Sequence, residues 1–390
     1  MIHSTDQAPK IETHFDCIVI GAGIAGTTVA AELARVMNVA LLERENQPGY
    51  HTTGRSAALY TVAYGPPIIR ALTRASGPFF NVPDSPYLTE PLLSKRGAVF
   101  VARKDQLAAL AALKEELGSA VKSLDASQVT QMVPLLREGY AAGGLHDEAA
   151  SDIDVHALHQ HYLRVFKAAG GTLVTRAEVT TIRRGEDWIV HTTAGRFRAP
   201  VVVNASGAWG DEIAALAGVA PRGLTPKQRT AMIVAAPEGM TPDGWPMVVD
   251  VEEQFYLKPD AGKLLISPAD AEPTVPCDAQ PDELWVAHCI DRIERAFDLS
   301  VRRIENKWAG LRNFLPSGCP LAAYDTDARG FFWLVGQGGY GIQTAPALGR
   351  AAAALIQHKP IPKDIADEGV TADSLCCDKG VQTEQQVASS

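Results

Sequence analysis

The strongest constraint on the fold lies in residues 15–43, where an apolar run, a glycine-rich turn and a helical pattern follow one another. Residues 17–20 predict a strand, residues 25–37 a helix and residues 39–42 a second strand. Glycines 21, 23 and 26 have the spacing of a dinucleotide-binding loop. In such a loop they allow a tight turn, close approach of the backbone to a pyrophosphate, and close helix–strand packing. The unit predicts an α/β domain that holds phosphates at a helix N-terminus.

Glu43 ends the second predicted strand, about twenty residues after the first glycine, where a carboxylate binds the adenosine ribose. An acid at this place selects a ribose without a 2′-phosphate. Gly336, Gly338 and Gly341 repeat the glycine spacing, but no strand with a terminal acid follows, so we do not predict a second dinucleotide site. The helix after Gly341 instead suits the anionic N1–C2=O region of a reduced flavin. The motifs alone do not distinguish FAD from NAD.

Composition and charge indicate a globular protein and exclude several other classes. A chain of 390 residues with 46% apolar residues is globular and long enough for two domains. Its net charge of −9, without a dense basic run, argues against a nucleic-acid partner. No apolar run approaches the ~18 residues of a membrane span, and the polar N-terminus lacks a signal-peptide core, so we expect a cytoplasmic protein. The six cysteines form no metal-binding pattern, and no metal site is predicted.

The rest of the chain predicts two kinds of structure. Strands at 172–175, 179–183 and 188–192 have meander spacing, the strand at 201–204 leads into another small-residue turn, and residues 78–91 are expected to be irregular. From 224 to 312, separated strands and a helix at 281–297 predict a second, sheet-rich domain inserted into the first. Residues 363–390 are polar, and a poorly ordered tail is expected there.

Together these motifs resemble the FAD-dependent D-amino acid oxidase superfamily, and within it the bacterial D-arginine dehydrogenases. The resemblance extends from Phe15 to Ile356 and is most specific in QPGYHTTGRSAALYTVAYG (47–65), QFYLKPDAG (254–262), KWAGLRNF (307–314) and QGGYGIQT (337–344). It implies a Rossmann-like FAD-binding domain of residues 1–85, 145–220 and 310–362. An antiparallel-sheet substrate domain would comprise residues 86–144 and 221–309.

The resemblance also implies a noncovalent FAD and a set of residues that bind it. The substrate carboxylate would contact Arg229, Tyr256 and Arg312, with Tyr64, Gly339 and Gln343 around the rest of the pocket. A guanidinium offers a carboxylate two parallel charge-assisted hydrogen bonds, which would orient the substrate Cα–H toward the flavin. The implied FAD-binding residues are Gly21, Gly23, Ala25, Gly26, Glu43, Arg44, Thr52, Thr53, Gly54, Arg55, Ser56, Ala57, Ala58, Leu59, Val179, Gly338, Gly339, Tyr340, Gly341, Ile342 and Gln343.

The implied reaction is oxidative deamination of a D-amino acid by hydride transfer from Cα to flavin N5, with no essential side-chain base and electrons passing to oxygen or a quinone-type acceptor. Two positions depart from the arginine-oxidising pattern. Thr89 replaces an acid, with Glu90 one place later, and Leu59 replaces a histidine. The sequence therefore does not decide between a D-arginine-like substrate and one with an apolar or differently charged side chain.

Three alternatives are also open. The same fold could oxidise glycine, sarcosine or a 2-hydroxy acid. The dinucleotide site could serve an NAD-dependent dehydrogenase. A flavin-binding protein without turnover could act as a redox sensor.

Overall fold

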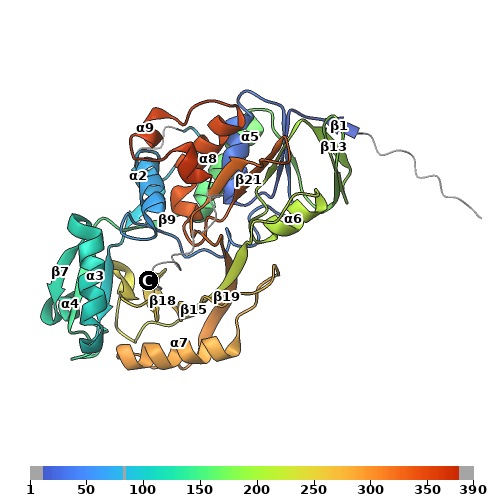
Figure 1. Ribbon diagram of the computed structural model, residues 1–390. Coiled ribbons are helices and arrows are strands. Elements are labelled where there is room, and N and C mark those ends of the chain that lie inside the picture. Colours follow the sequence, from blue (N-terminus) through green and yellow to red (C-terminus); the bar gives the residue numbers. More distant parts are fainter. Residues whose placement is uncertain (1–11, 82–84, 377–390) are drawn as a thin grey trace, which may run out of the picture.

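The computed structural model describes residues 12–81 and 85–376, which form two bodies connected by long strands (Figure 1). The upper body in that view is organised around a six-stranded sheet that is parallel except for β20 at one edge. In spatial order its strands are β10 (Thr172–Val174), β3 (Val39–Leu42), β2 (Cys17–Ile20), β14 (Val201–Asn204), β21 (Phe331–Val335) and β20 (Leu321–Tyr324).

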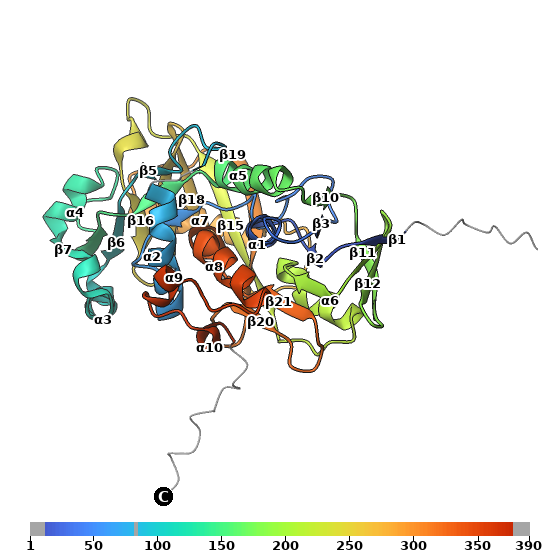
Figure 2. The ribbon, with the colours of Figure 1, turned by 90° about the horizontal axis from the view of Figure 1, so that it is seen from above.

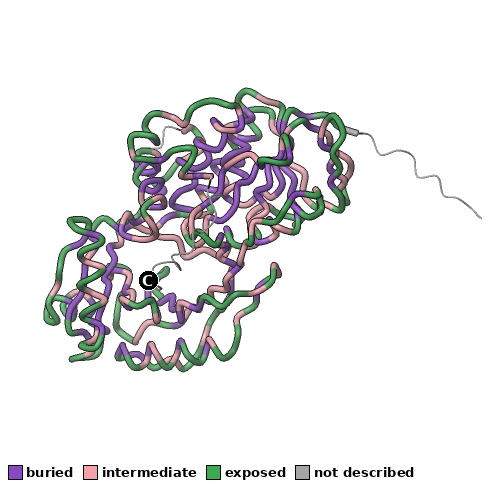
Figure 3. The backbone as a smooth tube through the Cα atoms, in the orientation of Figure 1, coloured by how far each residue is buried: buried purple, intermediate pink, exposed green. Residues whose placement is uncertain are grey.

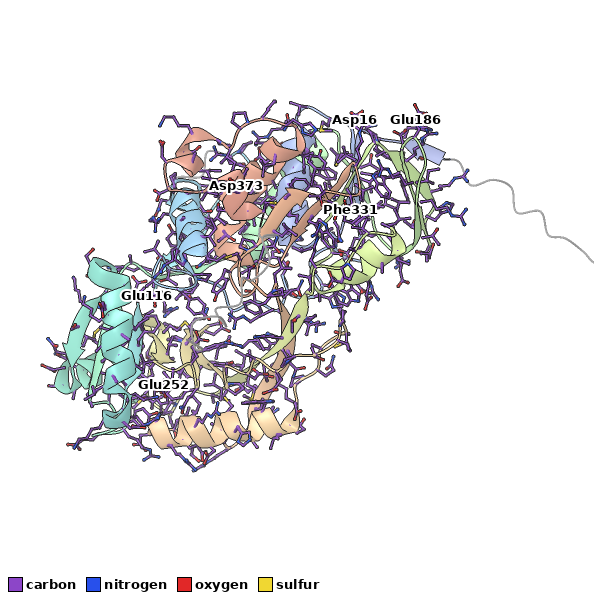
Figure 4. All side chains as sticks on the ribbon, viewed as in Figure 1. Asp16, Glu116, Glu186, Glu252, Phe331 and Asp373 are labelled. Carbon is purple, nitrogen blue, oxygen red and sulfur yellow. The ribbon has the colours of Figure 1, made fainter. Side chains whose placement is uncertain are left out.

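Both faces of this sheet are covered, which explains the uninterrupted apolar runs of its strands. One face packs against helices, and the other against a small four-stranded sheet that includes Phe197 and Trp188. Figure 2 shows the layers from above, and Figure 3 shows the buried backbone between them. Phe331, labelled in Figure 4, lies in this core. The covering elements are α1 (Ile24–Leu33), α2 (Pro67–Asn81), α5 (Val155–Ala168) and α8 (Gly341–Ile356) on the first face, and β1 (Glu12–His14), β13 (Arg196–Ala199), β12 (Trp188–Thr192), β11 (Val179–Arg184) and α6 (Gly210–Leu216) on the second.

The lower body is organised around an eight-stranded sheet, antiparallel except where β16 and β6 meet. In spatial order its strands are β19 (Ile304–Phe314), β15 (Thr225–Val234), β18 (Lys263–Ser267), β17 (Tyr256–Asp260), β16 (Met247–Asp250), β6 (Ala98–Ala102), β8 (Gly143–Asp147) and β7 (Lys122–Asp125). Other elements here are η1 (Lys104–Gln106), α3 (Leu107–Leu117), η2 (Gly118–Ala120), α4 (Ala126–Met132), η4 (Pro242–Gly244), α7 (Glu283–Ala296) and a small sheet of β4 (Leu59–Tyr60), β9 (Ser151–Ile153) and β5 (Leu93–Lys95).

The two faces of the eight-stranded sheet have different surroundings. Successive side chains of a strand point to opposite faces, so the pairing register assigns each residue to one face. Val99, Val248, Leu257 and Met232 point to one face and pack there with residues of α4 and α7. In Figure 1, α7 lies on the side turned away from the upper body. The other face therefore looks toward the parallel sheet.

Two local predictions were wrong. The strand at 172–174 does not belong to the meander, because β10 pairs in parallel with β3 at the edge of the six-stranded sheet. Regular structure also continues past Pro78, because α2 runs to Asn81. This helix buries Ile69, Leu72 and Phe80 on one side, and that burial outweighs the hydrogen bond that a proline removes.

The predicted poorly ordered tail is wrong for residues 363–376. Two short helices, α9 (Lys363–Ala366) and α10 (Ala372–Leu375), follow α8. Ile365, Val370 and Leu375 are completely buried in the helix-covered core. A few apolar residues at the right spacing are enough to attach an otherwise polar segment. Residues 377–390 lie outside the described part of the chain.

Deletion of residues 363–390 is expected to destabilise the protein more than deletion of residues 377–390 alone. Loss of three buried aliphatic side chains costs several kcal/mol, since one Leu or Ile to Ala change in a core costs about 2–5 kcal/mol. The free energy of unfolding in urea, measured for both truncations, tests this. Equal stability of the two truncations would contradict it.

Candidate active site

A cavity of ≈ 380 Å³ opens where the carboxyl ends of the parallel strands meet the free face of the eight-stranded sheet. This is where an open α/β sheet binds its ligands. The implied substrate residues Tyr64, Arg229, Tyr256, Arg312, Gly339 and Gln343 all line it. Of the implied cofactor residues, those that line it are Gly21, Gly23, Ala25, Glu43, Arg44, Thr52, Thr53, Arg55, Ser56, Ala57, Ala58, Leu59, Val179, Gly338, Gly339, Gly341, Ile342 and Gln343.

Four singled-out residues do not line the cavity. Gly26 packs against the backbone of the glycine loop, and Gly54 closes a turn through a hydrogen bond from its N–H to the Gly49 carbonyl. Tyr340 packs edge-on against the ring of Tyr64. Glu90 is exposed outside the cavity, so the structure places it away from the implied substrate contacts.

Hydrogen bonds fix the loop between β2 and α1. The carboxylate of buried Glu43 accepts a hydrogen bond from the Ala22 N–H (2.9 Å), and the Thr53 hydroxyl accepts one from the Ile24 N–H (2.9 Å). His159 Nε2 lies 2.9 Å from the Ala22 carbonyl oxygen. Because a carbonyl oxygen only accepts, Nε2 carries a proton, and burial lowers the pKa of His159, which keeps the ring neutral. The loop is thus held in one conformation.

The cavity also contains polar groups that the protein itself does not satisfy. Among the described residues, His51 Nδ1, Asn313 Oδ1, Gln337 Nε2 and Gln343 Nε2 are buried, have no hydrogen-bond partner and line this cavity. Buried polar atoms are rarely left unpaired. Donors and acceptors spread over one long cavity, together with the glycine loop and Glu43, fit a dinucleotide that carries a polar ring. The site therefore fits FAD.

Sheet register brings the two arginines together. Arg229 on β15 is paired with Gly310 on β19, and Arg312 stands two residues beyond Gly310. The two side chains therefore share one face as diagonal neighbours. Gly339 allows Arg312 its position, because a Cβ at Gly339 would lie 2.2 Å from Arg312 Nε.

Polar contacts orient both guanidinium groups without neutralising them. Arg312 donates to the Tyr64 hydroxyl (3.1 Å), and its guanidinium lies over the rings of Phe314 and Tyr340. Arg229 Nε donates to the Asp270 backbone carbonyl (2.7 Å). In the part of the chain that the structure describes, no carboxylate forms an ion pair with either arginine. The two cations are therefore available to an anion that enters the cavity.

Two groups of functional candidates were not identified from the sequence. Buried Asp270 accepts hydrogen bonds from the Thr230 N–H and hydroxyl, which holds β15 in place next to Arg229. Asp270 follows β18, and no sequence motif around it indicates a functional role. Phe100 and Val249 also line the cavity, but they stand in ordinary apolar strands. Only the register of the sheet shows which face they point to.

Two features are absent from the described residues, 12–81 and 85–376. No helix there is both long enough and apolar enough to cross a membrane. No group of three or more His, Cys, Asp and Glu side chains in that part is arranged to hold a metal ion.

The parallel sheet, the glycine loop with its terminal acid and the cavity with its unsatisfied polar groups are the features of a dinucleotide-dependent oxidoreductase. A family model described as "FAD dependent oxidoreductase" (DAO) matches residues 16–355. The chain belongs to this family. The predictions of the superfamily, of an FAD-dependent enzyme and of an α/β FAD-binding fold are confirmed.

Several known proteins are similar to this chain. Glycine oxidase of Geobacillus kaustophilus is 25% identical over 381 residues, covering 92% of this chain and 97% of the relative. Its crystal structure has a TM-score of 0.77 at 23% identity, over 89% and 95% of the two chains. The L-alpha-glycerophosphate oxidase of Mycoplasma pneumoniae, solved with FAD bound, has a TM-score of 0.80 at 18% identity, over 88% and 95%. Dimethylglycine dehydrogenase of Rattus norvegicus is 23% identical over 93% of this chain, which spans 45% of that relative.

Proposed function

We propose that this enzyme oxidatively deaminates a free D-amino acid to the imino acid, which hydrolyses to a 2-oxo acid and ammonia. The observation that carries the proposal is the pair Arg229 and Arg312, which share a face in the cavity without a carboxylate partner in the described chain. A partly buried guanidinium without a counter-ion is costly, so a substrate carboxylate is the partner that the site lacks. The relatives named for glycine and dimethylglycine support a substrate with an amine beside a carboxylate.

The chain's residues would position the substrate. Bound noncovalently, FAD supplies a hydride acceptor. The two guanidinium groups would hold the carboxylate through charge-assisted hydrogen bonds, and the hydroxyls of Tyr64 and Tyr256 would donate further ones. Fixing the carboxylate at these points orients Cα within the cavity and accounts for selection of one enantiomer. The acid that lines this end, Glu253, is exposed, which favours a mechanism without a side-chain base.

The kcat/KM is expected to rise with pH and to show no decrease up to about pH 10. The amine must lose its proton before oxidation, so kcat/KM increases as the ammonium titrates. Burial raises the pKa of Tyr256 above its ordinary value of 10.0, so its neutral, donating form persists throughout this range. The pH profile of kcat/KM tests this. A decrease below about pH 10 that disappears in Tyr256→Phe would show that Tyr256 ionises earlier than proposed.

A second candidate is oxidation of glycine or an N-methylated glycine, favoured by the names of the relatives. These substrates use the same carboxylate contacts but have no side chain. We also propose that the reduced enzyme passes its electrons to oxygen or to a quinone-type acceptor.

The test is anaerobic mixing of the purified enzyme with D- and L-amino acids, glycine, sarcosine and 2-hydroxy acids, following flavin absorbance. Rapid reduction by D-amino acids, with slower reduction by their L-enantiomers, is expected. Faster reduction by glycine or sarcosine than by any D-amino acid would support the second candidate. A flavin that no amine reduces would overturn the proposal.

A further inference from the structure

We infer that the side chain of the substrate lies against an apolar wall and that the enzyme prefers D-amino acids with leucine-, methionine- or phenylalanine-like side chains over cationic ones. This inference rests on the proposed function and specifies the substrate class of the same site. The wall comprises Ala98 and Phe100 of β6 with Met247 and Val249 of β16, and all four line the cavity.

Register places these four side chains on one face. In the parallel β6–β16 pair, Ala98 is the partner of Met247 and Phe100 is the partner of Val249. The intervening residues, Val99 and Val248, point to the opposite face and pack beneath α4 and α7. Because side chains alternate along a strand, the four wall residues form one continuous surface.

The wall begins beside the carboxylate contacts. Val249 is the cross-strand partner of Tyr256 on β17, so the side chains of these two residues are neighbours on the same face. Phe100 and Val249 pack in a cluster that includes Leu117 and Leu145, the cross-strand partner of Phe100 on the same face. A substrate whose carboxylate reaches Arg229 and Arg312 would therefore have its side chain within reach of a rigid apolar surface.

The acids near this end are poorly placed to bind a cation. Glu253 lines the cavity from the turn after β16 but is exposed to solvent, where an ion pair contributes at most about fivefold to binding. Asp147, buried opposite Ala98 on β8, does not line the cavity. Its carboxylate already accepts hydrogen bonds from the Thr61 hydroxyl (2.5 Å) and the Ala149 N–H (3.0 Å).

The relative sizes of these effects decide the preference. One methylene group in an apolar pocket changes kcat/KM by about tenfold or more. A leucine or phenylalanine side chain offers several such groups to the wall. A lysine or arginine side chain would have to place its charge next to this apolar surface, and it would gain only a solvent-screened ion pair with exposed Glu253.

The first test compares kcat/KM for D-leucine, D-methionine and D-phenylalanine with that for D-arginine and D-lysine. We expect kcat/KM for the three apolar substrates to exceed that for D-arginine and D-lysine by about tenfold or more. D-Alanine is too short to cover the wall, so its kcat/KM should be lower than that of the three apolar substrates. Calorimetric binding of 4-methylpentanoate and 5-guanidinopentanoate gives a readout without turnover, and the first should bind more tightly. Equal or greater use of D-arginine or D-lysine would overturn the inference but leave the proposed function intact.

The second test changes the wall. Val249→Glu should shift the ratio of kcat/KM for D-leucine to that for D-lysine about 100-fold toward D-lysine. Val249→Gln, whose side chain has the shape of glutamate without its charge, should shift this ratio far less. If Val249→Glu does not fold, Phe100→Ala also tests whether the wall contacts the substrate side chain. It should lower kcat/KM for D-leucine about tenfold more than for D-alanine. Equal losses for the two substrates would show that the wall does not contact the side chain. If no amino acid reduces the flavin of the unmodified enzyme, the proposed function itself fails.

Discussion

Arg312→Met is expected to lower kcat/KM for the best D-amino acid about 10³-fold while FAD content remains unchanged. Arg312 is held by the Tyr64 hydroxyl and by two aromatic ring faces, and it has no carboxylate partner among the described residues. Methionine fills a similar space without charge or donors, so the substrate carboxylate would enter the cavity without its counter-ion. Flavin absorbance, substrate-dependent flavin reduction and steady-state kinetics measure the effect.

The stability of the same variant provides a second readout. Removing a partly buried, unpaired cation relieves a desolvation cost, so the unfolding temperature should remain the same or rise. Arg312→Lys keeps the charge but loses the planar fork, and an intermediate loss of activity is expected. Arg303→Met, at an exposed position, is the matched control. A kcat/KM within about threefold of the unmodified enzyme in Arg312→Met would exclude Arg312 as the carboxylate contact.

This opposition between activity and stability reflects how the site is built. The lower body uses one face of its large sheet for an ordinary apolar core under α7 and the other for the cavity. The cavity face includes the charged residues Arg229 and Arg312, neither of which belongs to the buried core. The core face provides the stability that allows the other face to hold an unpaired charge.

The dinucleotide site could be predicted from the sequence because its parts are close together in the chain. Strand, turn, helix and terminal acid lie within residues 15–43, and each has a local signal. The separate structural roles of the glycines could also be predicted from their spacing. Gly21 has φ +100°, a conformation that favours glycine, and Gly26 provides the close helix contact.

The substrate end could not be derived from spacing. Arg229 and Arg312 are brought together by the pairing of β15 with β19, which are far apart in the chain. The sequence suggested them only through the resemblance to a family. The apolar wall was not recognised at all, because Phe100 and Val249 are indistinguishable from core residues until the register shows their face.

Gly26→Ala is expected to weaken FAD binding about 100-fold or more and to yield largely colourless protein. A Cβ at Gly26 would lie 1.8 Å from the Gly21 carbonyl oxygen and 3.3 Å from Ala205 Cβ. Neither neighbour can yield: the carbonyl belongs to the tight turn itself, and Ala205 follows the central strand β14. The helix must move outward, which displaces the Ala22 and Ile24 N–H groups from Glu43 and Thr53.

Gly26 does not line the cavity, so this loss would be transmitted through packing and not through a lost contact with the cofactor. Gly244→Ala is the matched control, since a Cβ at Gly244 has no atom within 4 Å. FAD content after purification and the dissociation constant from flavin fluorescence measure the effect, and circular dichroism shows whether the fold persists. Full FAD content in Gly26→Ala would mean that the helix can retreat without disturbing the loop, and the link from helix packing to phosphate binding would be wrong.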